Sequence, residues 1–193
     1  FLNEEITQLQ LYGLLFLILV GMLATVVATG HKIKLVEIGS IIFVTAYIFI
    51  GFYCLFMIRN LSLSHVAYLL LTIWFTDSFA YFGGMKFGKN KLSPKISPNK
   101  SIEGSVIGSL SSIAIALLFF FTTDVFSSLA VAIAITLVVS VVGQFGDLIE
   151  SAYKREYQVK DSSNLLPGHG GIFDRFDSVI LSAPCLIILL SLF

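Results

Sequence analysis

Charged side chains gather near the carboxyl-terminal end of a chain in which only 12% of the residues are charged. The segment from Gln144 to Ser178 carries six acids and four bases, a net charge of −2, between two long apolar runs. Beside lipid such groups are costly unless they face a cavity, a metal or each other, so the segment is predicted to be a functional site. The segment contains bases that could bind phosphate, but acids outnumber them. This combination indicates a divalent cation that is held by the carboxylates and contacts a phosphorylated substrate.

The order of residues in this segment resembles a known signature. It runs Ser151-x-x-Lys154-Arg155, Lys160-Asp161, Pro167-Gly168-His169-Gly170-Gly171 and Asp174-Arg175-x-Asp177. This order is similar to the signature of the phosphatidate cytidylyltransferases, also called CDP-diacylglycerol synthases, and it is unbroken here. The signature segment as a whole is taken as 147–178.

A second block of the chain is also similar to that family, which shows Ser-Pro-x-Lys-Ser/Thr-x-Glu-Gly at the start of a helix. The matching residues are Ser97-Pro98-Asn99-Lys100-Ser101-Ile102-Glu103-Gly104. Asn99 stands where Lys is common in the family and Ser101 where Thr is common. We expect these departures to weaken at most one phosphate contact, and we expect Ser101 or the loop before it to cap the following helix.

The resemblance implies that CMP is transferred from CTP to phosphatidic acid, giving CDP-diacylglycerol and pyrophosphate for phospholipid biosynthesis. Such an enzyme, a transferase of the nucleotidyltransferase class, works mainly by positioning its reactants and neutralising their charge. Hard oxygen ligands favour Mg²⁺, and the sequence has no paired His or Cys spacing of the kind that holds zinc. A second cation is left open.

The candidate residues are assigned roles on this basis. Asp147 and Asp174 are the leading metal ligands, and Asp177 and Asp161 are the next candidates. The bases expected to grip phosphate are Lys154, Arg155, Lys160 and Arg175. Glycines whose backbone N–H groups can approach an anion are Gly168, Gly170 and Gly171. His169 is expected either to donate to a phosphate or to brace its turn through the backbone. The other expected substrate contacts are Asp77, Ser97, Lys100, Ser101, Glu103, Gly104 and Ser151.

The elements that must position these residues are membrane spans. With 56% hydrophobic residues and a mean hydropathy of +0.92, the chain is not an ordinary water-soluble domain. Apolar runs predict an all-α polytopic membrane helix bundle of about six transmembrane helices, with the polar site between the fifth and sixth. The predicted spans are 11–29, 38–58, 66–82, 106–122, 128–145 and 179–193, the last beginning near Ile172. We expect 1–193 to be a single membrane-embedded domain that lacks the N-terminal helices of a longer protein.

The third predicted span carries an acid, Asp77, in its apolar second half. Trp74, Asp77, Tyr81 and Gly84 share one helical face, so the carboxylate is expected to look toward a cavity. A packing contact between helices is the alternative explanation.

The distribution of bases predicts the orientation. If the N-terminus lies outside, 11 of the 12 bases fall on inside loops and only Arg59 lies outside, as the positive-inside rule requires. The site then faces the cytoplasm of an integral membrane protein, expected in a bacterial inner membrane, where CTP can meet lipid. The net charge of zero points to no nucleic acid partner; homo-oligomerisation is left open.

Two rival functions remain at this stage. One is a related enzyme, a CTP-dependent lipid kinase or a cytidylyltransferase for another lipid. The other, from a different class, is a cation-coupled membrane transporter that uses Asp77, Asp147 and Asp174 as ion sites. Against the transporter, the sequence shows no inverted repeat and its polar residues cluster on one side.

Overall fold

The structure is a computed structural model that describes residues 2–30, 32–163 and 170–193, with side chains in the first helix described from Leu15 onward. It divides into two units, residues 1–48 and 49–193, and each is described by itself. The predicted site falls entirely within the second unit.

The first unit contains helix α1 (Leu2–Ala28) and the first half of helix α2 (Leu35–Leu61). Glu37, in the first turn of α2, accepts a hydrogen bond from the backbone N–H of Lys34 at 3.1 Å and so caps the helix. Large apolar side chains of α1, such as Phe16 and Leu17, are well exposed on the protein surface. Such a surface suits contact with lipid.

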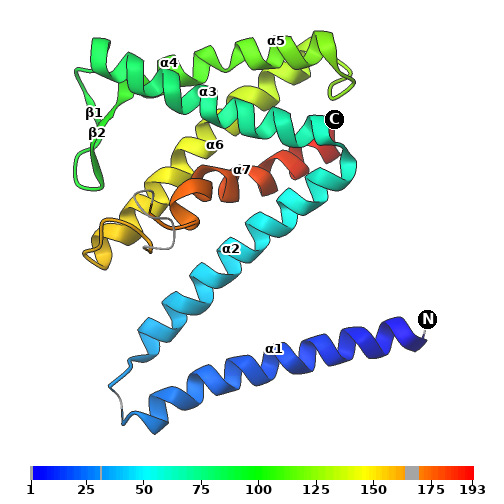
Figure 1. The fold of residues 1–193 in the computed structure, drawn as a ribbon, viewed down its shortest axis with the longest axis vertical. Helices are drawn as coiled ribbons and strands as arrows, with labels where there is room; N and C mark the ends of the chain where they lie inside the picture. The colour runs from blue at the N-terminus through cyan, green and yellow to red at the C-terminus, as the bar shows by residue number, and fades with distance from the viewer. Residues whose placement is uncertain (1, 31, 164–169) are drawn as a thin grey trace. The chain divides into compact units, whose positions relative to one another are not determined.

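The second unit contains the rest of α2 and every element that builds the site. These elements are α3 (Leu63–Phe87), β1 (Lys91–Ser93), β2 (Ser97–Ser101), α4 (Ile102–Ser111), α5 (Ile113–Thr122), α6 (Leu129–Glu156) and α7 (Phe173–Leu192). Figure 1 shows the hairpin of β1 and β2, the end of α6 and the start of α7 at one end of this unit, and the α2–α3 and α5–α6 turns at the other. The chain therefore passes back and forth between two ends, as successive spans require.

Five stretches of the described chain are long and apolar enough to cross a membrane: α2, α3, α4 with α5 (Ile102–Thr122), α6 and α7. The predicted all-α membrane bundle is thus confirmed, and the chain is an integral membrane protein. In α1 the described apolar helix, Leu15–Ala28, is shorter than that, so the count of six spans stays a prediction.

Close helix packing in the second unit depends on residues without large side chains. A Cβ atom built on Gly104 of α4 would lie 2.9 Å from the Cα of Gly84 in α3, and one built on Gly146 of α6 would lie 3.1 Å from the Cα of Ser178 in α7. These glycines let α3 pack on α4 and α6 pack on α7 with their backbones almost in contact. Both helix pairs carry residues of the site.

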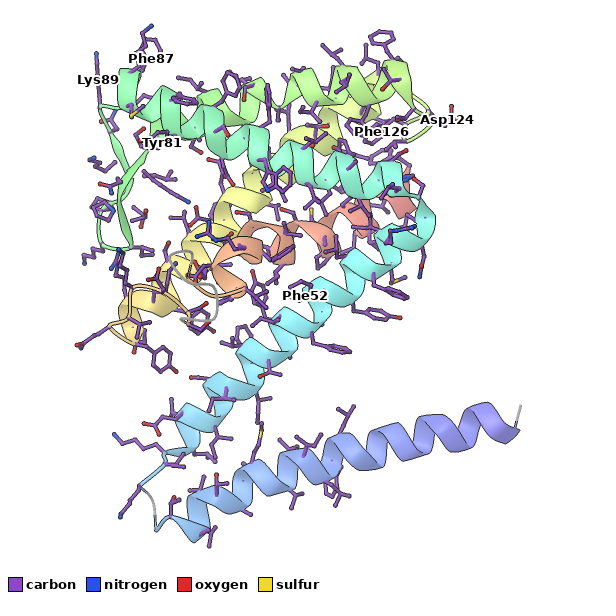
Figure 2. The ribbon with its side chains drawn as sticks, in the orientation of Figure 1. Phe52, Tyr81, Phe87, Lys89, Asp124 and Phe126 are labelled. Carbon is purple, nitrogen blue, oxygen red and sulfur yellow. The ribbon has the colours of Figure 1, made fainter. Side chains whose placement is uncertain are left out.

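The core of the bundle lies between α3, α5, α6 and α7, away from the hairpin. Tyr68 is fully buried there, and its hydroxyl shares a 2.7 Å hydrogen bond with the Thr136 hydroxyl. The Tyr68 ring also meets Phe119 and Phe126 edge-on. Figure 2 shows Phe126 near the α5–α6 turn, at the opposite end of the unit from Lys89 beside the hairpin.

The segment after the third predicted span differs from the expected loop. Helix α3 continues to Phe87, and β1 and β2 then form an antiparallel hairpin in which Lys91 pairs with Ser101 and Ser93 with Ser97. The hairpin is closed at its base because the Ile102 N–H donates to the Asn90 carbonyl at 2.9 Å. Proline and lysine content favoured a loop, whereas these backbone pairs and side-chain anchors on α4 and α6 hold it as strands.

Candidate active site

A cavity of about 780 Å³ opens between α3, the hairpin, α4, α6 and α7. Its charged lining comes from Asp77 of α3, Lys100 of β2, Asp147 of α6, and Asp174 and Arg175 of α7, together with Asp177. Its apolar lining includes Trp74, Tyr81, Met85 and Leu92. One cavity therefore joins a charged wall to an apolar one, which suits a ligand with an ionic head and an apolar body.

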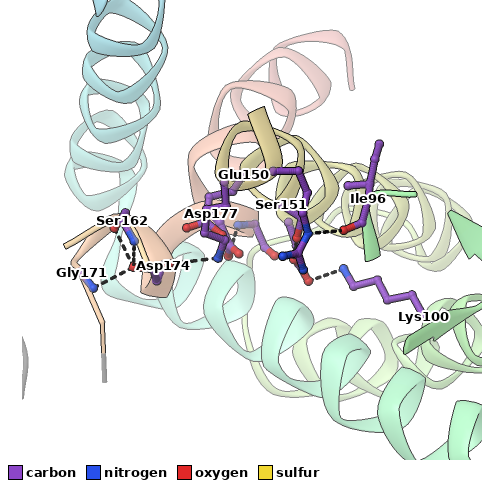
Figure 3. A network of polar contacts seen from close by, with 12 residues as sticks. Ile96, Lys100, Glu150, Ser151, Ser162, Gly171, Asp174 and Asp177 are labelled. Carbon is purple, nitrogen blue, oxygen red and sulfur yellow. Dashed lines mark hydrogen bonds and ion pairs between the residues drawn. The ribbon is translucent and has the colours of Figure 1, made fainter. Parts of the chain in front are cut away.

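Three carboxylates converge in this region. One oxygen from each of Asp147, Glu150 and Asp177 lies within 4.8 Å of the others, which is close enough to share one metal ion. Asp147 and Glu150 are one turn apart on α6, and Asp177 comes from the facing turn of α7 (Figure 3). The close α6–α7 packing at Gly146 brings the two helices together at this level.

The Glu150 side chain is only 1% exposed, and its Oε1 atom has no hydrogen-bond partner among the described residues. A buried carboxylate oxygen without a hydrogen-bond partner carries a free-energy cost. A bound cation would offset that cost. The acidic cluster could therefore hold a metal ion, in agreement with the first indication from the sequence.

Lys154 connects the two helices beside this cluster. Its Nζ atom lies 2.6 Å from Glu150 Oε2 on the same helix and 3.0 Å from Asp174 Oδ1 on α7. The ammonium partly compensates two carboxylates that are 1% and 7% exposed. In this structure Lys154 thus bridges α6 to α7.

Asp174 organises the end of the signature segment through its second oxygen. Oδ2 accepts hydrogen bonds from the Ser162 N–H at 2.9 Å, the Ser162 hydroxyl at 2.6 Å and the Gly171 N–H at 2.7 Å. Gly170 has a φ of +79°, a conformation that glycine adopts without strain, and it lines up the following N–H. Asp174 therefore ties the chain at Ser162 and at Gly171 to the start of α7. It also lines the cavity.

The hairpin is fastened to α6 at two points. Lys100 forms an ion pair with Asp147, and Arg155 Nε donates to the Ile96 carbonyl at 3.2 Å (Figure 3). The Ser151 hydroxyl donates to the other oxygen of Asp147 at 3.3 Å. Asp147 thus stands where hairpin, helix and acidic cluster meet.

The block that opens α4 serves as the hairpin's base. Ser101 caps the helix, its hydroxyl accepting a 3.1 Å hydrogen bond from the Gly104 N–H, so the predicted cap is confirmed. The Glu103 carboxylate accepts hydrogen bonds from the Lys89 N–H at 3.0 Å and from the backbone and side chain of Asn90 at 3.1 and 2.7 Å. Ser97 begins β2 and is half-buried.

The structure brings most of the predicted site together but not all of it. Lys160 and Asp161 lie in an exposed stretch after α6. Neither Asp161 nor Asp174, which was expected to be a leading metal ligand, is one of the three converging carboxylates. Gly168 and His169 lie outside the described residues. The helix of the last span begins at Phe173, close to the predicted Ile172.

Sequence reasoning left two residues out of the site. Glu150 falls at helical spacing with Asp147, Ser151 and Lys154 on one polar face of α6, and its spacing of three from Asp147 was the available signal. Gln144 lines the cavity one turn before Asp147, and in an apolar run its amide was the available signal. Neither could be ranked without knowing which face of α6 meets α7.

Fold and site together define an integral membrane protein with an acidic cluster and fixed cations around one cavity, a class suited to anionic, phosphate-bearing ligands. The profile of the cytidylyltransferase family matches residues 2–193. The chain belongs to the cytidylyltransferase family.

Individual relatives agree with this assignment. The chain is 47% identical over 160 residues to the phosphatidate cytidylyltransferase of Bacillus subtilis (strain 168), covering 81% of this chain and 60% of the relative. It is 37% identical over 188 residues to that of Staphylococcus haemolyticus (strain JCSC1435), covering 97% and 72%, and 40% identical over 168 residues to that of Staphylococcus aureus (strain COL), covering 87% and 65%. The chain thus spans three fifths to about seven tenths of these relatives' length. The resemblance found in the signature is confirmed.

Proposed function

We propose that this chain carries the catalytic site of a phosphatidate cytidylyltransferase, which transfers CMP from CTP to phosphatidic acid. The observation that carries the proposal is the convergence of Asp147, Glu150 and Asp177 within 4.8 Å beside a cavity that Lys100 and Arg175 also line. Relatives that share 37–47% of its residues bear the same enzyme name. Residues 1–193 are proposed to act as one membrane-embedded domain.

The reaction is a substitution at phosphorus. A phosphate oxygen of phosphatidic acid forms a bond to the α-phosphorus of CTP, while the bond from that phosphorus to the bridging oxygen breaks and its electron pair leaves with pyrophosphate. Both reactants are anions, so catalysis consists largely of positioning them and offsetting their repulsion.

The cluster of Asp147, Glu150 and Asp177 offers the hard oxygen ligands that Mg²⁺ prefers. Asp174 lines the same cavity, but its two oxygens already accept hydrogen bonds from Lys154, Ser162 and Gly171, so it is a less favoured ligand than the three acids of the cluster. Bound Mg²⁺ would supply Lewis-acid neutralisation of the phosphate oxygens. Asp161, which is exposed in this structure, is a less favoured ligand, and a second cation is left open.

The basic residues fall into two groups, one that lines the cavity and one that holds neighbouring elements in place. Lys100 and Arg175 face the cavity and are proposed to bind phosphate oxygens, with the backbone N–H groups near Gly170 and Gly171. Lys154 and Arg155 hold the surrounding elements in place, since the former bridges two carboxylates and the latter holds the hairpin. Roles of Lys160, Gly168 and His169 in binding phosphate stay predictions.

The apolar wall of the cavity suits the lipid substrate. Trp74, Tyr81 and Met85 of α3 are 57%, 64% and 63% exposed, and they flank Asp77 on a face that borders the cavity. Acyl chains can lie against such side chains while the phosphate stays at the acidic cluster. The cavity is proposed to open to the cytoplasmic side of the bacterial inner membrane, as the distribution of bases indicates.

The test is an assay of the purified protein with CTP, phosphatidic acid and Mg²⁺, following CDP-diacylglycerol and pyrophosphate. We expect Asp147→Asn to lower the rate by more than about 100-fold, because even groups that only orient metal ligands are worth 10–100-fold. Asp124→Asn is the matched control, since Asp124 lies at the opposite end of the unit (Figure 2). Equal activity of a folded Asp147→Asn protein would refute the proposed role.

The same assay separates the rival functions. A lipid kinase would give a phosphorylated lipid and CDP instead of CDP-lipid and pyrophosphate. A transporter would move solute across liposomes without any need for CTP, and its activity would leave the nucleotide intact.

A further inference from the structure

Gln144 is a polar side chain that the reaction above does not use. It lies on α6 one turn before Asp147, is 7% exposed and lines the cavity. Its Nε2 atom donates to the Ser109 hydroxyl at 2.9 Å and lies 3.4 Å from the Ser105 carbonyl and 3.5 Å from the Ser140 carbonyl. Two carbonyls can only accept, so they fix which end of the amide is the nitrogen.

This arrangement leaves the amide oxygen of Gln144 to the cavity. The hydrogen bonds given for Gln144 among the described residues are all made by Nε2, so Oε1 is the amide atom that a ligand in the cavity can reach. A ligand group that donates a hydrogen bond can pair with this oxygen. The cavity therefore offers an acceptor at this position, one helical turn from the acidic cluster.

The two proposed substrates differ in the donors that they offer. Away from its phosphate, a diacylated phosphatidic acid has only ester oxygens, which accept hydrogen bonds. The nucleoside of CTP carries an exocyclic amino group and ribose hydroxyls, which donate. An acceptor set one turn away from the phosphate-binding residues thus matches the nucleoside and not the lipid.

We propose that Gln144 is a specificity-determining residue whose Oε1 accepts a hydrogen bond from the nucleoside part of the nucleotide substrate. The proposal rests on the proposed function and deepens it. Asp77 lines the same cavity from α3, so oxygen-bearing side chains face the nucleoside from two helices. The amino group of cytosine and the ribose hydroxyls are the two candidate donors.

The experiment measures kcat/KM of the purified protein for CTP, UTP and 2′-deoxy- and 3′-deoxy-CTP, with phosphatidic acid and Mg²⁺ constant. Wild type is compared with Gln144→Met, which keeps the length of the side chain and removes the acceptor. We expect the preference for CTP over the nucleotide lacking the critical donor to fall roughly 10-fold or more in the variant, since a site that hydrogen-bonds a substrate group rejects the analogue that lacks it.

The pattern identifies the donor. A fall in the CTP to UTP ratio assigns the amino group, because UTP carries a carbonyl there, and a fall in the ratio to a deoxy analogue assigns a ribose hydroxyl. Ser111→Ala, also on α4, is the matched control, because its hydroxyl donates to the Gly108 carbonyl and not to Gln144, so both ratios should stay as in wild type.

Two results would overturn the inference. One is an unchanged pair of ratios in Gln144→Met, and the other is an equal change in Ser111→Ala, which would show that the ratios respond to any change in packing at α4. If Gln144→Met does not fold, the wild-type protein is tested alone. A wild-type preference of less than about twofold for CTP over UTP and over both deoxy analogues contradicts the proposal. A wild type that forms no CDP-lipid refutes the proposed function instead.

Discussion

Lys154 on α6 lies 3.0 Å from the Asp174 carboxylate on α7, and this ion pair joins the two helices that carry the acidic cluster. The same ammonium lies 2.6 Å from Glu150, so one cation serves two carboxylates that are almost buried. A buried charge without an opposite charge nearby destabilises the fold, so these three side chains stabilise it only together. The site therefore depends on a charge balance between acids and bases in addition to the carboxylate oxygens that could hold a metal ion.

Lys154→Met tests this balance. It leaves two buried carboxylates without their cation, and we expect a loss of roughly 3 kcal/mol in stability, the usual order when one partner of a buried pair is removed. Thermal unfolding of the detergent-solubilised protein measures it. Lys95→Met, on an exposed lysine of the hairpin turn, should change stability little. Equal unfolding temperatures for the two variants would contradict the bridging role, whereas Lys154→Arg should recover most of the loss.

Glu150→Gln separates metal binding from packing. The amide keeps the volume of the side chain but removes a negative oxygen from the cluster, so we expect the Mg²⁺ concentration for half-maximal activity to rise roughly 10-fold or more. Titration of activity with Mg²⁺ at saturating CTP is the measurement. Glu156→Gln, at the exposed end of the same helix, is the matched control and should keep the wild-type requirement. A lower maximal rate with an unchanged Mg²⁺ requirement would assign Glu150 to packing alone.

Much of the fold and part of the site could be predicted because they depend on local patterns. Runs of apolar residues predict the spans, and the spacing of Asp147 and Ser151 predicts one polar face of α6. Which acids converge depends on how α6 and α7 pack, and that contact is set by Gly146 against the backbone of Ser178. For this reason Glu150 was missed. Similarly, no local sequence pattern predicts that Lys154 forms ion pairs with two carboxylates, Glu150 and Asp174, instead of binding a phosphate.

Glu103→Ala tests whether the base of the hairpin positions Lys100. The carboxylate accepts hydrogen bonds from Lys89 and Asn90, so its loss should loosen the hairpin and misplace the Lys100 ammonium at the cavity. We expect KM for CTP to rise roughly 10-fold with a smaller change in kcat, since a ligand contact is weakened more than the chemistry. Steady-state kinetics check this, and Glu103→Gln, which retains an acceptor oxygen, should recover part of the effect. An unchanged KM in Glu103→Ala would show that the hairpin holds its place without this anchor.

Gly108→Leu tests whether close packing of α3 on α4 positions the site. A Cβ atom built on Gly108 would lie 2.8 Å from the Ala80 Cβ, and the Thr76 carbonyl is also in the way, so the two helices must move apart. Because Ala80, Ser101 and Ser105 all line the cavity, we expect loss of stability of about 2 kcal/mol or more together with a fall in activity. Gly39→Leu in α2 is the matched control, since no atom of the described residues lies within 4 Å of a Cβ at that glycine. Thermal unfolding and CDP-lipid formation are measured on both variants, and a Gly108→Leu protein as stable and active as Gly39→Leu would show that α4 can shift without disturbing the cavity.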